Sequence, residues 1–532
     1  MFSPLRREWE HDSRAKPSYG PRPMRALFVS SLILLAACAA RQPVAVAVTA
    51  TPAPLDAGAV PVDAGAEPVD AGTAQSPVDA GPPAPSTAGQ PITATKSWSV
   101  KLEGLGTSSP RTVDLTGDGV LDVVLGGGVQ GQSGWVYAVD GANGKLLWKS
   151  RFKEEFYATP TLSDANRDGV PDVFIGGRDF EWTALNGKDG KKLWTLRAAN
   201  KGADIPKRNF NGALVVGDQD ADGVDDLLLS QGGSYDDDKR LPGRLMVVSA
   251  ATGKLITNVM FPDQKETYSI PALLSVNPLE VIAGSGGETV GGHLSRLTLT
   301  PEKATATWEL DSPKQGVISS PLLTDIGGEL AAIDVLYGGI VVRLDAASGA
   351  VRWTTPRKGF EARASPAPGR FGGSSTADVV ATMSKGEFPV YKWTNLVVWL
   401  DGATGQVLDE ASTGVFSSAS PLVADFDGDG LDETVALSMD SFTIQEGSVT
   451  STLTIYDGAR GKKKRLELKL KGAGQATPAL ADFEGDGKLD LVLTYFGKVE
   501  RYVLELPGAP APKVRWGGFR GPRFNGVDPK PE

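Results

Sequence analysis

The chain has 532 residues, with 54 Lys and Arg against 64 Asp and Glu and a formal net charge of −10, a balance that argues against nucleic acid as a partner. One cysteine and two histidines, His11 and His293, exclude a disulfide framework, a cysteine-based zinc site and an iron–sulfur cluster, and nearly exclude Ser-His-Asp catalysis. The length exceeds what one hydrophobic core organises, so we expect several domains or a repeat architecture.

The first element that the sequence predicts is a secretory signal. Residues Met24–Cys38 combine a basic start, a short apolar run and a small-residue end, and the run is too short to span a bilayer. The last four, Leu-Ala-Ala-Cys, resemble the lipobox of bacterial lipoproteins, in which the cysteine is diacylated and becomes the new N-terminus. The resemblance implies a signal peptide over residues 1–37, with Met24 as an alternative start, and a lipid anchor on Cys38. The alanines after Cys38 favour export to the outer membrane, with the protein periplasmic or surface-exposed.

A stalk follows the anchor. Residues 38–95 consist largely of Ala, Pro, Val, Thr and Gly, and Asp-Ala-Gly recurs at Asp56, Asp63, Asp70 and Asp79. A segment of this composition without aromatic residues cannot bury a core. We therefore predict a disordered Pro/Ala linker between the membrane and a folded domain.

Residues 96–527 contain eight repeats of about fifty residues, a period typical of repeat architectures. Each unit opens with a small-residue step, two residues that are usually followed by a proline, and then enters its first strand. It continues with an acidic turn, an apolar strand, a third strand, a five-residue turn ending in glycine, and a fourth strand that often carries Trp. The opening positions are Pro110, Pro160, Leu214, Pro271, Pro321, Pro366, Pro421 and Pro478. The turn glycines are Gly144, Gly190, Gly253, Gly349, Gly405 and Gly461, and the tryptophans are Trp148, Trp194, Trp308 and Trp353. This pattern predicts an all-β fold, an eight-bladed β-propeller of four-stranded antiparallel blades, with residues 528–532 as a tail.

Two segments compete to close the ring. Trp98 stands as far before Pro110 as Trp148 stands before Pro160, so its segment resembles a fourth strand without a blade of its own. We predict that this segment completes the last blade. Lys513–Trp516 is the alternative, and the sequence leaves the choice open.

Five of the eight acidic turns share the spacing Asp-x-(Asp, Glu, Asn or Thr)-x-Asp-Gly-x-x-(Asp or Glu). Oxygen ligands at alternate positions, with glycine at the sixth and a backbone carbonyl at the seventh, suit a hard cation. The sites are Asp114, Thr116, Asp118, Val120, Asp122; Asp164, Asn166, Asp168, Val170, Asp172; Asp218, Asp220, Asp222, Val224, Asp226; Asp425, Asp427, Asp429, Leu431, Glu433; and Asp482, Glu484, Asp486, Lys488, Asp490. Crowding so many carboxylates is costly without a cation, so we predict about five Ca²⁺ sites.

An EF-hand does not explain these loops. The twelfth position holds Leu125, Ile175, Leu229, Ala436 or Leu493 rather than a bidentate Glu, and a strand follows where an EF-hand needs a helix. A simple Asp-Gly hairpin turn is the other alternative. The turns at Ser275, Asp325 and Gly369, in units four to six, lack the ligand series and are predicted to hold no ion.

The acidic loop with its following strand resembles the FG-GAP/VCBS repeat of integrin-type propellers, which implies calcium at the five loops. The turn Asp140–Gly144 and the strand after it resemble the PQQ-like repeat, as does the segment Trp516–Val527. The resemblance covers roughly residues 96–527. It raises a quinoprotein dehydrogenase as an alternative function, although such enzymes commonly carry a vicinal cysteine pair that this chain lacks. A scaffold lipoprotein for outer-membrane assembly is a second alternative.

The function predicted from these features is non-enzymatic binding of a protein or polysaccharide partner by a calcium-stabilised propeller. Strand alternation places the acidic turns and the five-residue turns on one face of the ring. The long excursions, residues 198–212, 232–244, 384–395 and 439–451, fall on the other face. They carry aromatic residues of the kind that interfaces favour, so we predict a partner surface at Phe210, Tyr235, Phe388, Tyr391 and Trp393.

Overall fold

The computed structural model describes residues 89–104, 106–178, 180–197, 208–233, 240–373, 375–385, 394–440, 449–458 and 463–528, all within the compact unit Arg41–Glu532. The predicted signal peptide, Cys38 and the stalk up to residue 88 lie outside these residues. Within the described ranges no helix has the length and hydropathy needed to cross a membrane.

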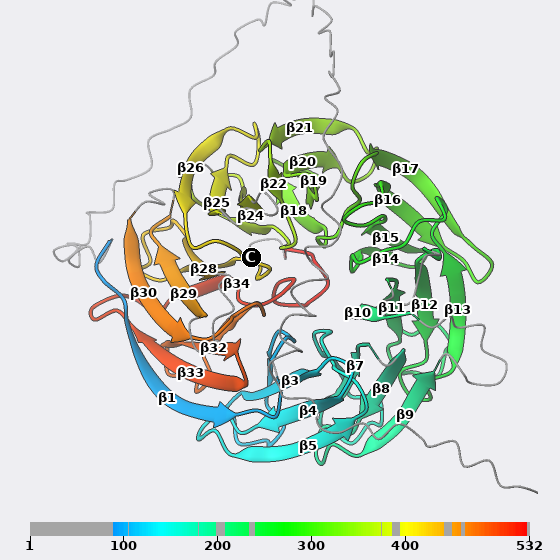
Figure 1. Cartoon of the computed structure of the whole chain (residues 1–532), viewed down its shortest axis with the longest axis horizontal. Coiled ribbons are helices and arrows are strands. Elements are labelled where there is room, and N and C mark those ends of the chain that lie inside the picture. Colours follow the sequence, from blue (N-terminus) through cyan, green and yellow to red (C-terminus); the bar gives the residue numbers. More distant parts are fainter. Residues whose placement is uncertain are drawn as a thin grey trace, which may run out of the picture. The chain divides into compact units, whose positions relative to one another are not determined.

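Eight antiparallel blades form a closed ring, with the first strand of each blade at the centre and the fourth at the rim (Figure 1). The predicted fold class is confirmed. Blades 1 to 3 contain β2 (Arg111–Val113), β3 (Asp122–Val129), β4 (Ser133–Val139), β5 (Leu146–Phe152); β6 (Thr161–Ser163), β7 (Asp172–Gly176), β8 (Glu181–Leu185), β9 (Lys192–Arg197); and β10 (Phe210–Val215), β11 (Leu227–Gln231), β12 (Arg244–Val248), β13 (Leu255–Met260). Blades 4 and 5 contain β14 (Ala272–Val276), β15 (Leu279–Gly284), β16 (Gly292–Leu299), β17 (Ala304–Ser312); and β18 (Leu322–Ile326), β19 (Glu329–Leu336), β20 (Ile340–Asp345), β21 (Val351–Pro356). Blades 6 and 7 contain β23 (Ala367–Gly369), β24 (Asp378–Lys385), β25 (Thr394–Leu400), β26 (Val407–Ser412), with β22 (Phe360–Glu361) also on β24; and β27 (Leu422–Asp425), β28 (Glu433–Met439), β29 (Thr450–Tyr456), β30 (Lys464–Lys471).

The segment around Trp98 completes the last blade, as we predicted from the sequence. Blade 8 consists of β31 (Ala479–Ala481), β32 (Leu489–Tyr495), β33 (Lys498–Glu505) and, as its rim strand, β1 (Thr93–Lys101) from the N-terminal side of the ring. The competing segment forms β34 (Lys513–Trp516), which pairs with β27 as an extra inner strand of blade 7. Each of the two candidate strands therefore completes a different sheet.

Tryptophans on the rim strands hold neighbouring blades together. Trp148 of blade 1 donates its indole N–H to the carbonyl of Gly187 in blade 2 at 2.7 Å. Its ring lies where a Cβ on Gly190 would be, 2.5 Å from the nearest ring atom, and Gly190 has a φ of +68°. The turn glycine is thus required both by its left-handed backbone and by the tryptophan above it. Trp98, Trp194, Trp308 and Trp353 make the same contacts with the next blade.

Hydroxyl groups hold the blades together near the centre. The N–H of the residue before the opening proline, or of its equivalent, donates to the hydroxyl of the same residue one blade further on. The bonds are Ile270 to Ser320, Ser320 to Ser365, Ser365 to Ser420, Ser420 to Thr477 and Thr477 to Ser109, with lengths of 2.9–3.1 Å. The last bond crosses from blade 8 to blade 1. The small-residue step seen in the sequence is therefore an inter-blade connection.

A C-terminal segment, Gly517–Asp528, lies at the centre of the ring and is called the central segment below (red in Figure 1). Its carbonyl oxygens accept hydrogen bonds from inner strands of three blades: Leu480 donates to Gly517, Leu273 to Asn525 and Leu323 to Gly526, at 2.7, 3.3 and 2.7 Å. The sequence predicts only that these residues belong to the propeller domain, in a segment that resembles PQQ-like proteins. The structure shows that they run across the ring and bond to blades 8, 4 and 5.

The hydrophobic core lies between the blades rather than inside any one of them. Second strands such as Val123–Leu125 are fully buried at consecutive positions, because neighbouring blades cover both faces of each sheet. This explains the apolar bursts of the sequence. Rim strands alternate between partly buried and exposed residues, as in β17.

Candidate functional site

The acidic loops are closed by hydrogen bonds to their own backbone. In blade 1, Asp114 accepts bonds from the N–H groups of Gly117 at 2.7 Å and Gly119 at 3.0 Å, and Asp118 accepts one from Val120 at 2.9 Å. Gly119 has a φ of +85°, so the sixth position needs glycine. The first aspartate of the other four loops bonds the same glycine, at 2.8–3.3 Å. The structure therefore brings the predicted side chains of each loop together, and each carboxylate keeps lone pairs that these bonds do not use.

The ninth carboxylate of the loop has a structural task. Asp122 accepts bonds from the N–H groups of Leu115 and Thr116 in its own loop and of Gly141 in the five-residue turn, at 2.9, 3.2 and 3.0 Å. Asp172 and Asp226 also tie the two turns of their blades together. Burial raises the pKa of each of these three carboxyl groups, and the amide bonds oppose that rise. The acidic and five-residue turns thus share one face, as the strand order predicted.

Blade 6 retains this ninth residue without the rest of the loop. Asp378 accepts bonds from Phe371 and Gly372 at 2.8 Å and from Gly402 at 3.3 Å. Our sequence reasoning missed Asp378, because it searched for the whole ligand series. An aspartate directly before the second apolar strand is the signal that finds it. The carboxylate at this position is accordingly not evidence for a cation by itself.

An arginine occupies the carboxylate cluster of blade 7. Arg465, on β30, is fully buried and places Nη1 2.6 Å from Asp427 and 2.8 Å from Glu433. Oxygens of Asp425, Asp427 and Glu433 lie within 4.8 Å of one another, close enough to share a cation. However, the guanidinium already contacts two of the three. Burial raises the pKa of Glu433 to about 8, and Arg465 opposes that rise.

Blade 8 has the same arrangement from another strand. Arg501, on β33, is fully buried, and its Nε lies 2.8 Å from Asp490 and its Nη2 2.7 Å from Glu484. Its Nη1 donates to the carbonyl of Gly141 in blade 1 at 2.8 Å. These residues do not fit a calcium ion well, because two of the predicted ligands are bound to an internal cation. The predicted donor sets of blades 7 and 8 therefore differ from the other three.

Blades 1 to 3 have no buried arginine at their acidic loops in the part of the chain that the structure describes. In blade 3, carboxylate oxygens of Asp218, Asp220 and Asp222 lie within 4.8 Å of one another and face solvent. The N–H of Gly223 lowers the pKa of Asp218, so this carboxylate is ionised at neutral pH. In blade 2 a half-exposed lysine, Lys188, lies 3.3 Å from Asp168. The donor set of blade 3 fits Ca²⁺, which prefers carboxylate oxygens in flexible loops.

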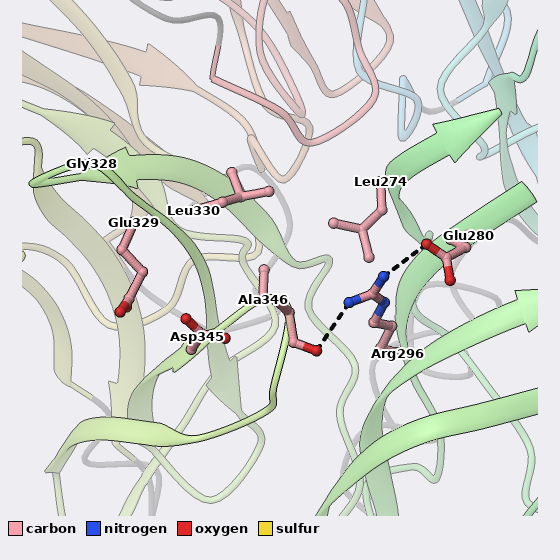
Figure 2. Close-up of a pocket in the computed structure, with 9 residues that line it drawn as sticks. Leu274, Glu280, Arg296, Gly328, Glu329, Leu330, Asp345 and Ala346 are labelled. Carbon is pink, nitrogen blue, oxygen red and sulfur yellow. Dashed lines mark hydrogen bonds and ion pairs between the residues drawn. The ribbon is translucent and has the colours of Figure 1, made fainter. Parts of the chain in front are cut away.

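Blades 4 and 5, whose turns lack the ligand series, form a pocket between them (Figure 2). The cavity of about 500 Å³ is lined by Leu274, Glu280, Arg296, Gly328, Glu329, Leu330, Asp345, Ala346 and Ala347. Arg296 bridges the two blades, since it donates to Glu280 at 2.8 Å and to the carbonyl of Ala347 at 3.0 Å. The lining carboxylates are all paired with arginines. The pocket consequently presents balanced charge.

His293 belongs to a hydrogen-bonded cluster in blade 4. Its Nδ1 lies 2.9 Å from Asp263, and the hydroxyl of Ser285 donates to the same carboxylate at 2.5 Å. The aspartate thus lies between the serine and the histidine, whereas a serine nucleophile needs the histidine next to it. His293 Nε2 points toward Asp311 at 3.8 Å. This geometry does not activate Ser285.

The predicted partner surface is corrected at one residue. Phe210 is fully buried and packs against Trp182 with ring centroids 5.8 Å apart, so it belongs to the seam between blades 2 and 3. Its position at the start of a first strand, where blades meet, explains the burial. Tyr235, Phe388, Tyr391 and Trp393 lie outside the described residues, and their role stays a prediction.

Comparisons with known proteins support the PQQ-like character. Residues 88–285 match a family model described as outer membrane protein assembly factor BamB, of the PQQ_2 type. No curated protein matches the chain by sequence. The FG-GAP/VCBS resemblance has no counterpart among these matches and stays a prediction.

Solved structures share the fold at low identity. A quinohemoprotein alcohol dehydrogenase from Comamonas testosteroni has a TM-score of 0.52 and 12% identity, over 78% of this chain and 76% of that one. A europium-containing methanol dehydrogenase has a TM-score of 0.51 and 12% identity, over 77% and 93%. BamB from Moraxella catarrhalis has a TM-score of 0.43 and 14% identity, over 77% and 97%. The first two show a common propeller fold, and identities this low show nothing about activity.

Proposed function

We propose that the chain is a non-enzymatic propeller scaffold, anchored in the cell envelope through Cys38, that binds a protein partner in the assembly of outer-membrane proteins. The observation that carries this proposal is the central segment. A cofactor enclosed by the ring needs space near the ring axis, and Gly517–Asp528 lie at the centre of the ring and bond to three blades there (Figure 1). A quinoprotein dehydrogenase is therefore the less favoured alternative.

The inventory of reactive residues supports the same choice. The one cysteine belongs to the lipobox, and the described histidine is held by Asp263 in an order that activates no nucleophile. The match of residues 88–285 to the assembly-factor family supports a protein partner over a polysaccharide. The lipobox agrees with a periplasmic or surface position at the outer membrane.

We further propose that Ca²⁺ binds in blades 1 to 3. The loops of these blades offer carboxylate, amide or hydroxyl oxygens at the first, third, fifth and ninth positions, and the seventh-residue carbonyl would complete each set. Bound Ca²⁺ would neutralise the carboxylates of each loop and stiffen the face that they share with the five-residue turns. Blades 7 and 8 are left out, because Arg465 and Arg501 already pair with two of the predicted ligands in each loop.

Deletion of the gene in the source organism tests the scaffold function. We expect the deletion to reduce the level of folded outer-membrane β-barrels, measured by their heat-modifiable migration in gels. The native chain should restore that level, and the Cys38→Ser variant should not. Dye-linked oxidation of primary alcohols should not depend on the gene, with or without added pyrroloquinoline quinone. Normal barrels together with gene-dependent alcohol oxidation would show the enzyme alternative to be right.

Calcium titration tests the ion sites. Isothermal titration of the purified chain should give three equivalents with dissociation constants around 0.1–1 mM, as for extracellular modules. Asp222→Asn should remove one equivalent, whereas Asp486→Asn in blade 8 should remove none. Equal losses from both variants would refute the distinction between the two groups of loops.

A further inference from the structure

Two arginines lie buried at the centre of the ring without an acidic partner. Arg111 begins β2, the innermost strand of blade 1, and is 4% exposed. Arg520 lies in the central segment and is 3% exposed. Residues from opposite ends of the propeller sequence therefore bring two positive charges to the ring axis.

The hydrogen bonds of the two guanidinium groups are incomplete. Arg111 donates its Nε–H to the carbonyl of Pro160 at 2.8 Å, and its guanidinium lies over the ring of Phe524. Arg520 donates from Nη2 to the carbonyl of Pro271. Nη1 of Arg111 and both Nε and Nη1 of Arg520 are buried and have no partner among the described residues. Three N–H-bearing nitrogens are thus left to bond to something else.

No carboxylate among the described residues compensates these charges. Burial lowers the pKa of Arg520 to about 9, and burial together with the charge of Arg520 lowers the pKa of Arg111. A buried charge without a counter-charge is costly, and two like charges are costlier. Three other buried arginines of the described residues, Arg343, Arg465 and Arg501, each contact a carboxylate.

We propose that Arg111 and Arg520 bind a small oxyanion, a phosphate or a carboxylate, at the centre of the ring. Guanidinium groups present N–H donors in a planar fork that matches the oxygens of such anions. The anion would link blade 1 to the central segment, which already bonds to blades 4, 5 and 8. This inference does not depend on the proposed scaffold function or on calcium.

The backbone around Arg520 suits a closely fitted site. Arg520 and Phe524 have φ values of +66° and +57°, a conformation that side chains rarely adopt and that the surrounding contacts must hold. A Cβ on Gly526 would lie 3.0 Å from Nη2 of Arg520. A side chain at position 526 would therefore crowd the guanidinium of Arg520.

Analysis of the purified chain tests the proposal without a variant. Denaturation of the desalted chain should release about one equivalent of oxyanion per chain. Ion chromatography of the released material then identifies the anion as phosphate or carboxylate. At constant ionic strength, phosphate or citrate should raise the unfolding temperature over chloride, with a rise that grows with the logarithm of concentration. Calcium is omitted and chelator added, so that citrate does not act through metal.

Two variants locate the effect. Arg520→Met should abolish both the released equivalent and the oxyanion-dependent shift, and Arg111→Met should weaken both. Arg352→Met, at an exposed arginine of the rim, is the matched control and should change neither. The proposal is overturned if the native chain releases no oxyanion and unfolds at the same temperature in phosphate, citrate and chloride. It is overturned equally if Arg520→Met keeps the full oxyanion shift.

Discussion

Replacing Arg465 by methionine should convert blade 7 from an arginine-neutralised loop into a calcium-dependent one. In the native chain the buried guanidinium contacts Asp427 at 2.6 Å and Glu433 at 2.8 Å. Methionine has a similar length and no charge, so Arg465→Met leaves two buried carboxylates facing each other. Removing one partner of a buried ion pair costs about 3–5 kcal/mol, and this is the expected loss in the free energy of unfolding at neutral pH.

The loss should depend on pH and on calcium. Burial already raises the pKa of Glu433 from 4.5 to about 8. A carboxyl whose folded pKa is raised adds stability below its unfolded pKa and loses it as pH rises through the folded value. The native chain shares this dependence up to about pH 8, and loss of the Arg465 guanidinium raises the pKa of Glu433 further, so the difference in stability between variant and native should widen above pH 8. Calcium at a hundred times its dissociation constant should restore about 2.7 kcal/mol, because the vacated oxygens can then share the ion.

Denaturant unfolding followed by tryptophan fluorescence, with 10 mM calcium or with chelator, measures these effects. Arg352→Met is the control: its side chain is 44% exposed and its pairs are on the surface, so the loss should stay below about 1 kcal/mol, with the calcium effect unchanged from native. The reasoning is refuted if calcium stabilises Arg465→Met no more than it stabilises the native chain.

Three further predictions follow from contacts of single residues. Trp98→Ala should lower the free energy of unfolding by about 3–5 kcal/mol and make β1 sensitive to protease, because the seam of blades 8 and 1 loses its tryptophan; an unchanged digestion pattern would contradict this. Asp378→Asn should cost about 1–3 kcal/mol and leave the calcium titration unchanged, whereas Asp226→Asn should lower both stability and calcium uptake. Asp334 is buried with one oxygen unpartnered, and burial raises its pKa to about 6. The contribution of the protonated Asp334 to stability is present below about pH 4 and is lost as pH rises through 6. Asp334→Asn should therefore be more stable than native by roughly 3 kcal/mol at pH 8 and not at pH 4. Parallel curves of unfolding free energy against pH for the two chains would refute this.

The repeat pattern was sufficient to predict the propeller and the closing strand. Trp98 could be placed because Trp98 and Trp148 stand the same number of residues before the next opening proline. In the structure those residues carry the chain from the rim of one blade back to the centre of the ring. The role of Lys513–Trp516 could not be decided in the same way. A short apolar strand pairs with any free inner edge, and β27 offered one that the sequence does not mark.

The ligand series predicted the loop geometry but not what neutralises each loop. Arg465 lies on the fourth strand of its blade, 32 residues from Glu433, and Arg501 on the third strand, 11 residues from Asp490, and the folded register brings each to its carboxylates. A charged residue at an otherwise apolar strand position is the sequence signal that could have identified them. The central segment was likewise missed, because its backbone bonds to other blades carry no side-chain pattern.

Arginine and, in our proposal, calcium are alternative ways to compensate the carboxylates of the acidic loops in this ring. Each acidic loop must bury a ninth carboxylate to hold its two turns together, and the loop's other carboxylates raise the cost. An arginine supplies its positive charge at the moment of folding, whereas calcium must be taken from solution. Blades 7 and 8, which use arginine, are those that receive β34 and β1 and so close the ring. Closure therefore needs no external ion, and chelation should loosen the turns of blades 1 to 3 while the seam of blades 8 and 1 stays intact.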